Sequence, residues 1–220
     1  MINSSVISDK NAAISDKNAA ISDKNAAISD KSMVDKLLKK HAKNFVSKEP
    51  ERKALEGIHY SKNGFIYVTN SHTLLSIENG HTEQKTVHYK TGKEMDMNYP
   101  EVGRLLDMDY DKTITLKLPK PYIPLIKVAS NIDQVGTLSS GNGDLLFRVA
   151  SPLGDFFKVV LGQTDTNLIV DLNVLYFHNA LNFFKDAGVD EVTILFNGSL
   201  RPVSFRADQF EILILPVRRD

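Results

Sequence analysis

The order of expected strands and helices repeats in the second half of this chain. The repeating unit is one strand, one helix and three further strands, identified from β-branched and aromatic runs, from Pro at a helix start and from Gly at a helix end. The first copy is expected at residues 113–118, 119–131, 135–139, 144–151 and 156–161. The second copy is expected at residues 167–172, 174–187, 191–197, 202–206 and 210–217. Helices segregated to one face of antiparallel sheets define an α+β fold built from duplicated units.

Residues 33–78 look like a third copy of this unit that lacks its first strand. A helix is expected to end before Pro50, and Asn63-Gly64 separates two strands, at 55–60 and 65–77, as a hairpin turn does. The helix carries apolar residues at helical spacing, which are Val34, Leu37, Leu38, Phe45 and Val46. The chain is thus expected to contain three related units.

A strict seven-residue repeat, Ile-Ser-Asp-Lys-Asn-Ala-Ala, precedes these units. It places in register Ile7, Ile14, Ile21 and Ile28. One large apolar residue per heptad makes a narrower stripe than a coiled coil needs, so we expect a disordered or marginally helical tail, with weak helical self-association as the alternative. The expected parts are this tail, a partial domain with a linker, and a domain of two units, at residues 1–32, 33–106 and 107–220.

The composition excludes several classes of protein. The chain has no cysteine, which removes disulfides, thiolate metal sites and a cysteine nucleophile. Its apolar runs are far shorter than the roughly 20 residues of a membrane-spanning helix, and its first residues lack the apolar core of a signal peptide. A cytoplasmic protein without membrane contact is expected. Lys plus Arg (27) equals Asp plus Glu (27), so net charge does not indicate a nucleic-acid partner.

The sequence contains no pattern typical of catalysis or metal binding. Ser71 and His72 are neighbours in an extended segment and point to opposite faces, and no Gly-x-Ser-x-Gly elbow surrounds the serine. The six histidines lack metal-ligand spacing, and Gly141-Asn142-Gly143 lacks the Lys-Ser/Thr tail of a phosphate-binding loop. We therefore expect no catalytic residue, metal site or cofactor.

Three ordered segments carry a resemblance to a known family. Residues 52–60 (RKALEGIHY) and 67–75 (YVTNSHTLL) resemble a hairpin ending in a Thr-Asp-Gly-His-Arg-Leu turn. Residues 99–106 (YPEVGRLL) resemble an aromatic-Pro-x-x-x-Arg linker. Residues 170–176 (VDLNVLY) start a helix, and residues 213–218 (LILPVR) resemble a C-terminal Met-Pro-Met-Arg signature. These segments are similar to those of bacterial DNA polymerase III beta subunits, the sliding clamps, and span about residues 33–218.

The resemblance implies a non-enzymatic protein with a peptide-binding pocket. In clamps the three segments form one pocket for a short peptide, carrying Gln and apolar or aromatic residues, from polymerases and other replication proteins. Carried over by position, the pocket residues are Thr69, Ser71, His72 and Leu74, then Pro100, Arg104 and Leu105, and finally Leu213, Ile214, Leu215, Pro216, Val217 and Arg218. From periodicity alone, a buried final strand is the better interpretation of 213–217, and only the resemblance favours the pocket.

Several lysines are candidates for contact with duplex DNA. Lys36, Lys39, Lys40 and Lys43 recur at spacings that place them on one helix face, which alone is typical of a solvated surface. The resemblance implies that this face lines a ring and contacts phosphates without reading bases, with Lys120 and Lys127 adding to it.

The chain also departs from the family pattern. Ser71 and Thr73 stand where the usual turn has Gly and Arg. A clamp subunit has three domains of two units each, so a chain of three units indicates a shortened phage- or mobile-element-type member, and closing a ring of the usual size would take about four chains. The expected function is a replication processivity factor that binds such peptides and encircles DNA as an oligomer. The alternative is a non-encircling adaptor or competitor that binds the same peptides.

Overall fold

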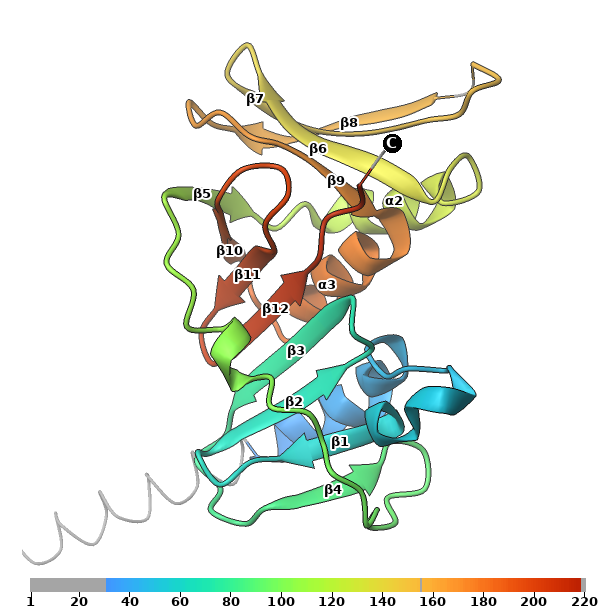
Figure 1. The fold of residues 1–220 in the computed structure, drawn as a ribbon. Coiled ribbons are helices and arrows are strands. Elements are labelled where there is room, and N and C mark those ends of the chain that lie inside the picture. The colour runs from blue at the N-terminus through green and yellow to red at the C-terminus, as the bar shows by residue number, and fades with distance from the viewer. Residues whose placement is uncertain (1–30, 155, 219–220) are drawn as a thin grey trace, which may run out of the picture. The chain divides into compact units, whose positions relative to one another are not determined.

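The computed structural model describes residues 31–154 and 156–218 (Figure 1). The isoleucine repeat predicted as a tail lies outside the described residues. The chain divides into two compact units, residues 1–38 and 39–220. Residues 31–41 are helical, as predicted for this part of the chain. The remaining elements belong to the second unit.

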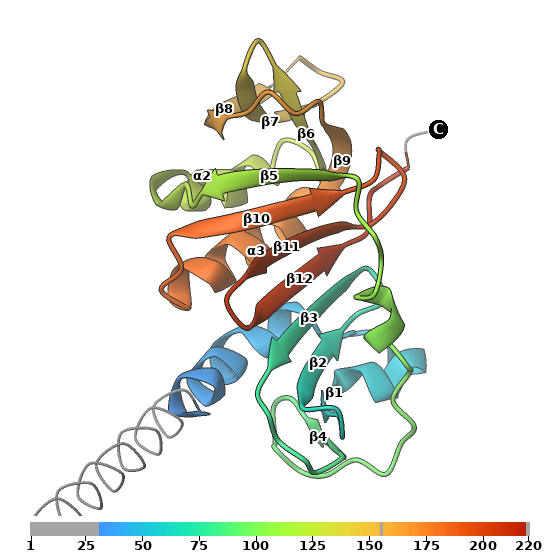
Figure 2. The ribbon, with the colours of Figure 1, turned by 90° about the vertical axis from the view of Figure 1, so that its left-hand side faces the viewer.

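An eight-stranded antiparallel sheet forms the larger part of the second unit, in the order β4-β1-β2-β3-β12-β11-β10-β5 (Figure 2). Its first four strands are β1 (Gly57–Tyr60), β2 (Phe65–Thr69), β3 (Thr73–Glu78) and β4 (Lys85–His88). The other four are β5 (Lys112–Lys117), β10 (Glu191–Phe196), β11 (Val203–Ala207) and β12 (Phe210–Ile214). The sheet therefore continues across the domain boundary that the sequence predicted near residue 106.

The pairing of β3 with β12 joins the two halves of this sheet. Its register runs from Phe210 opposite Ile77 to Ile214 opposite Thr73. Because side chains alternate along a strand, Ile212 and Ile214 are fully buried in the core, whereas Leu213 packs on the opposite face with Leu74.

A second sheet has the order β8-β7-β6-β9. Its strands are β6 (Val135–Gly141), β7 (Asp144–Ala150), β8 (Phe156–Gln163) and β9 (Ile169–Asn173). Each unit of the duplicated pair gives its first strand to the sheet of the other, since β9 pairs with β6 and β5 pairs with β10. The duplicated α+β fold predicted from the sequence is confirmed.

The helices lie on one side of the strands, and Figure 2 shows α3 behind β10, β11 and β12. Besides residues 31–41, the described α-helices are α2 (Ile123–Ala129) and α3 (Val174–Asp186). The described 3₁₀ turns are η1 (Ala42–Asn44), η2 (Pro50–Glu56), η3 (Gly103–Leu105) and η4 (Lys120–Tyr122). The side chain of Asn173 caps α3 by accepting hydrogen bonds from the amides of Leu175 and Tyr176. The apolar face of α3 includes the fully buried Phe177 and Phe183.

Several predicted elements differ from the observed ones. The strand predicted over 65–77 is interrupted by a turn between β2 and β3, and the strand predicted over 210–217 ends at Ile214. The helix predicted over 119–131 is shorter, because Pro124 lies in its first turn after a 3₁₀ segment. Strand β4 was missed, since its sequence, KTVH, is mostly polar. In the described part of the chain, no helix is long and apolar enough to span a membrane.

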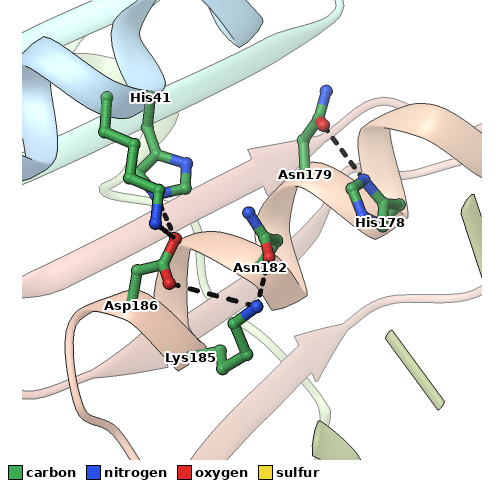
Figure 3. A network of polar contacts seen from close by, with 7 residues as sticks. His41, His178, Asn179, Asn182, Lys185 and Asp186 are labelled. Atoms are coloured by element: carbon green, nitrogen blue, oxygen red, sulfur yellow. Dashed lines mark hydrogen bonds and ion pairs between the residues drawn. The ribbon is translucent and has the colours of Figure 1, made fainter. Parts of the chain in front are cut away.

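A partly buried polar network connects residues 40–41 to α3 (Figure 3). His41 is 1% exposed, and its Nε2 lies 2.8 Å from Asp186 Oδ2. Lys40 Nζ reaches the same oxygen at 2.7 Å. Burial lowers the pKa of His41 and outweighs the opposing effect of the Asp186 carboxylate. Burial raises the pKa of Asp186, but the hydrogen bonds and positive charges of Lys40 and His41 outweigh this effect, so the pKa of Asp186 lies below its ordinary value.

This network makes the stability of the protein depend on pH. The pKa of His41 lies below its ordinary 6.5 in the folded chain, so the unfolded chain binds more protons between the two pKa values. The free energy of unfolding should therefore fall as the pH is lowered from about 7 to about 5. We expect a smaller fall in His41→Gln, measured by urea unfolding across that range. Equal pH slopes in the two proteins would contradict the assignment.

Candidate peptide-binding groove

The turn between β2 and β3 is held by side-chain hydrogen bonds to its own backbone. Thr69 Oγ1 donates to the carbonyl of Thr73 (2.6 Å) and accepts from the amide of Ser71 (3.1 Å). Asn70 Oδ1 accepts from the amides of His72 (2.9 Å) and Thr73 (2.8 Å). Ser71 has a left-handed φ of 76°. Glycine adopts this conformation without a steric cost, whereas Ser71 is held in it by the hydrogen bonds of the turn.

The segment after β12 continues beside this turn. The amide of Leu215 donates to the carbonyl of His72 (2.9 Å), and the amide of Val217 donates to the carbonyl of Asp171 on β9 (2.8 Å). The segment therefore passes from one sheet to the other. Its side chains alternate, so that Ile214 is fully buried whereas Leu215 is 38% exposed.

The linker before β5 packs on the face of the sheet that carries Leu74 and Leu213. The Tyr99 hydroxyl accepts from the amide of Thr69 (3.1 Å), and its ring stacks on His59 with the ring centres 4.6 Å apart. Burial raises the pKa of this hydroxyl strongly. Val102 completes an apolar cluster with Leu74 and Leu213. The linker is thus fixed against β2, β3 and β12.

These three segments enclose two adjoining hollows. The first has a volume of about 300 Å³ and is lined by Leu55, Thr69, Ser71, His72, Thr73, Leu74, Pro100, Glu101, Val102, Leu105, Leu213 and Leu215. The second has a volume of about 360 Å³ and is lined by His72, Asn173, Tyr176, Leu215, Pro216 and Val217. Because both hollows include His72 and Leu215, we treat them as one surface and call it the Leu215 groove.

Most of the residues predicted for the pocket line this groove. Those that do are Thr69, Ser71, His72, Leu74, Pro100, Leu105, Leu213, Leu215, Pro216 and Val217. Arg104 and Arg218 are exposed and line neither hollow, and Ile214 faces the core because it is one residue out of phase with Leu213 and Leu215. The sequence interpretation missed Leu55, Thr73, Glu101, Val102, Asn173 and Tyr176. All six of these positions lie within the segments that carried the resemblance.

The lysines predicted for DNA contact have different surroundings. Lys36 and Lys39 are exposed in the helical residues 31–41. Lys40, Lys43 and Lys127 line a third hollow of about 590 Å³. Lys120 lies apart from this hollow, with its Nζ 2.6 Å from Asp190 Oδ1. Among the residues that the structure describes, no group of three or more His, Cys, Asp or Glu side chains is placed to hold a metal ion.

Neither a protein-family model nor a curated protein sequence matches this chain. Solved structures do match. The DNA polymerase sliding clamp of Bacillus subtilis has 18% identity and a TM-score of 0.71 over 84% of this chain and 62% of the clamp. The C. crescentus beta sliding clamp has 14% identity and a TM-score of 0.73 over 86% of this chain and 64% of the clamp. The Helicobacter pylori beta clamp bound to a DNA ligase peptide has 16% identity and a TM-score of 0.67, over 83% of this chain and 62% of the clamp.

The chain therefore has the fold of bacterial DNA polymerase III beta sliding clamps, as the resemblance in its sequence predicted. It spans less than two thirds of the length of these clamps.

The left-handed residue in the groove wall provides a test of the turn. Ser71→Gly removes the steric strain between Cβ and the backbone at a φ of 76°, which stabilises the folded chain. Glycine also increases the conformational entropy of the unfolded chain, which offsets part of this gain. We expect the free energy of unfolding to rise by about 0.5–1 kcal/mol. Ser76→Gly, in the extended strand β3, should lower it instead. Urea unfolding measures both, and a destabilised Ser71→Gly protein would show that the turn differs from the one described.

Proposed function

We propose that this protein is a sliding-clamp-like replication factor that binds short peptides of polymerases and other replication proteins in the Leu215 groove. The observation that supports this is the convergence of three segments, distant in sequence, on one hollowed apolar surface. A solved clamp of the same fold, that of Helicobacter pylori, is bound to a DNA ligase peptide. The proposed role is binding and requires no catalytic group.

The groove has the chemistry expected of a peptide site. Leu74, Leu213 and Leu215 provide an apolar surface for leucine or phenylalanine anchors, while Ser71 and His72 provide polar groups at the rim. Because the turn and the linker are already fixed by internal hydrogen bonds, little ordering is needed when a peptide binds.

The proposed site differs from the family pattern in one charge. Thr73 stands where clamps have Arg, is 3% exposed, and uses its hydroxyl to donate to Asn70 Oδ1 at 3.1 Å. The position therefore supports the turn and offers no cation to a ligand. A peptide that relies on an ion pair at this position would bind this protein more weakly than it binds the clamps.

Removing one apolar contact should weaken peptide binding while the fold is retained. We expect Leu215→Ala to raise the Kd of a labelled peptide carrying Gln and Leu and Phe anchors by roughly tenfold, because Leu215 borders both hollows. His72→Ala should weaken binding similarly. Fluorescence polarisation measures the Kd, and Leu200→Ala, at an exposed leucine outside the groove, is the matched control. Equal Kd values in all four proteins would contradict the assignment.

We further propose that the exposed lysines contact duplex DNA when chains assemble around it. Supporting this, Lys36, Lys39 and Lys43 are exposed, and Lys39 and Lys43 have no ion pair with another described residue. Such contacts are independent of sequence and are weakened by salt, which permits sliding. Lys120 is less suited to this role because Asp190 neutralises it.

The encircling and adaptor alternatives differ in measurable ways. If chains encircle DNA, sedimentation should show an oligomer, and protein should remain on closed circular DNA but leave linear DNA by its ends. Reversing Lys36, Lys39 and Lys43 to Glu should lower retention and reduce the slope of log K against log salt, since each phosphate contact contributes about 0.9 to it. A monomer that leaves both DNAs equally would support the adaptor, and an unchanged salt slope would remove these lysines from the DNA path.

A further inference from the structure

The third hollow continues from the Leu215 groove and has a different chemistry. It includes His72 and Tyr176, which also line the groove. Most of its remaining polar lining consists of lysines and amide side chains, namely Lys40, Lys43, Lys48, Lys127, Asn44, Asn70, Asn179 and Asn182. The other polar residues in the lining are His41, Ser47, Glu49 and His178. We call this surface the basic hollow. Its position means that a chain lying in the groove can pass directly into it.

The basic hollow is positively charged after its own ion pairs are counted. Glu49 is the acidic side chain in its lining, and its Oε2 lies 3.0 Å from Arg52 Nε. Lys40 is neutralised by Asp186. Within the described residues, Lys43, Lys48 and Lys127 have no ion pair. Three cations therefore border the hollow without a carboxylate to balance them.

The boundary between the groove and the hollow is an aromatic pair. The rings of His72 and Tyr176 are nearly parallel, 18° apart in orientation, with their centres 6.2 Å from each other. The backbone carbonyl of His72 accepts a hydrogen bond from the amide of Leu215, which fixes the position of His72. A peptide anchored on Leu215 would thus cross a flat pair of rings before it meets the lysines.

We propose that the peptide bound in the Leu215 groove carries acidic residues beside its apolar anchors, and that the basic hollow holds them. This inference rests on the proposed function. The lysines would pair with carboxylates, and the half-buried amides of Asn44, Asn179 and Asn182 would hydrogen-bond to peptide backbone or to carboxylate oxygens. The partner class is therefore an acidic-flanked apolar peptide.

Duplex DNA fits the basic hollow as a whole less well, although Lys43 at its edge is shared with the DNA contact proposed above. Contacts with duplex phosphates need no apolar surface, and the exposed Lys36 and Lys39, which lie outside the hollow, suit that role. The lining of the basic hollow is instead concave, adjoins the apolar groove and is rich in amides, which suits an extended peptide.

The test compares two labelled peptides with the same Gln, Leu and Phe residues. One is extended by a short run of glutamates and the other by the same number of glutamines, with the extension placed at either end in turn. At low ionic strength, we expect the glutamate peptide to bind the full chain about fivefold to tenfold more tightly when it is extended at the end that enters the hollow. Added salt should reduce this ratio.

Paired variants assign the effect to the hollow. In Lys43→Gln/Lys48→Gln the ratio between the two peptides should fall to within about twofold, whereas the control Lys62→Gln/Lys158→Gln, outside the hollow, should keep the wild-type ratio. Equal binding of the two peptides to wild type, or a ratio unchanged in Lys43→Gln/Lys48→Gln, would overturn the proposal. So would loss of DNA retention in that variant with peptide discrimination intact, because the lysines would then serve the duplex.

A failure of the proposed function would give a different result from a failure of the acidic preference. If neither peptide binds a folded wild-type protein, the groove itself is not a peptide site, and the inference falls with it. If the glutamine peptide binds and Leu215→Ala abolishes that binding, the groove is established, and the ratio between the two peptides then decides the acidic preference separately.

Discussion

The antiparallel pairing of β3 with β12 is the interaction on which the candidate site depends. Its register sets Leu74 opposite Leu213 and brings the turn at Ser71 beside Leu215. Residues more than a hundred positions apart in the sequence thereby share one surface. Without this pairing, the hairpin and the C-terminal segment would each expose apolar residues with nothing to enclose them. The pairing therefore both joins the sheet and creates the groove.

Polar side chains around the groove are used mainly to hold the backbone in place. Thr69, Asn70 and Thr73 bond to one another across the turn, and Tyr99 satisfies the amide of Thr69. A buried amide without a partner would be costly, so these bonds fix the walls before any ligand arrives. The groups left to recognise a ligand are few, and His72 is the one that borders all three hollows. Specificity for a ligand would then depend on the shape of the Leu215 groove and on the lysines of the basic hollow next to His72.

The strands and helices that could be predicted were those with a strong local pattern. Alternating apolar residues identified the strands of the duplicated units, and Gly188 marked the end of α3. Strand β4 could not be predicted, because its place depends on pairing with β1 and its sequence is mostly polar. The strand pattern also missed the turn at Ser71, which only the resemblance implied, since a left-handed serine has no local signal and is held by side chains around it.

For the site, the resemblance identified the segments but not the orientation of each side chain. Ile214 was included and belongs to the core, although the two-residue period of a strand separates it from Leu213 and Leu215. Tyr176 was omitted from the site although it lies within the quoted segment 170–176 and faces the groove one helical turn after Asn173. The basic hollow could not be predicted, because Lys48 and Lys127 meet only through the packing of distant helices and turns.

The internal repetition also bears on how chains could assemble. Strand β8 is the last strand of its unit, as β3 is of the first unit, and β3 is covered by β12. Strand β8 has β7 as its one neighbour in the sheet, and Phe156 and Val160 on it are 69% and 46% exposed. Both edges of β12 are occupied, by β11 and β3. A second copy therefore cannot cover β8 with β12 while keeping its own groove, so a ring of this chain alone requires a different strand at that edge.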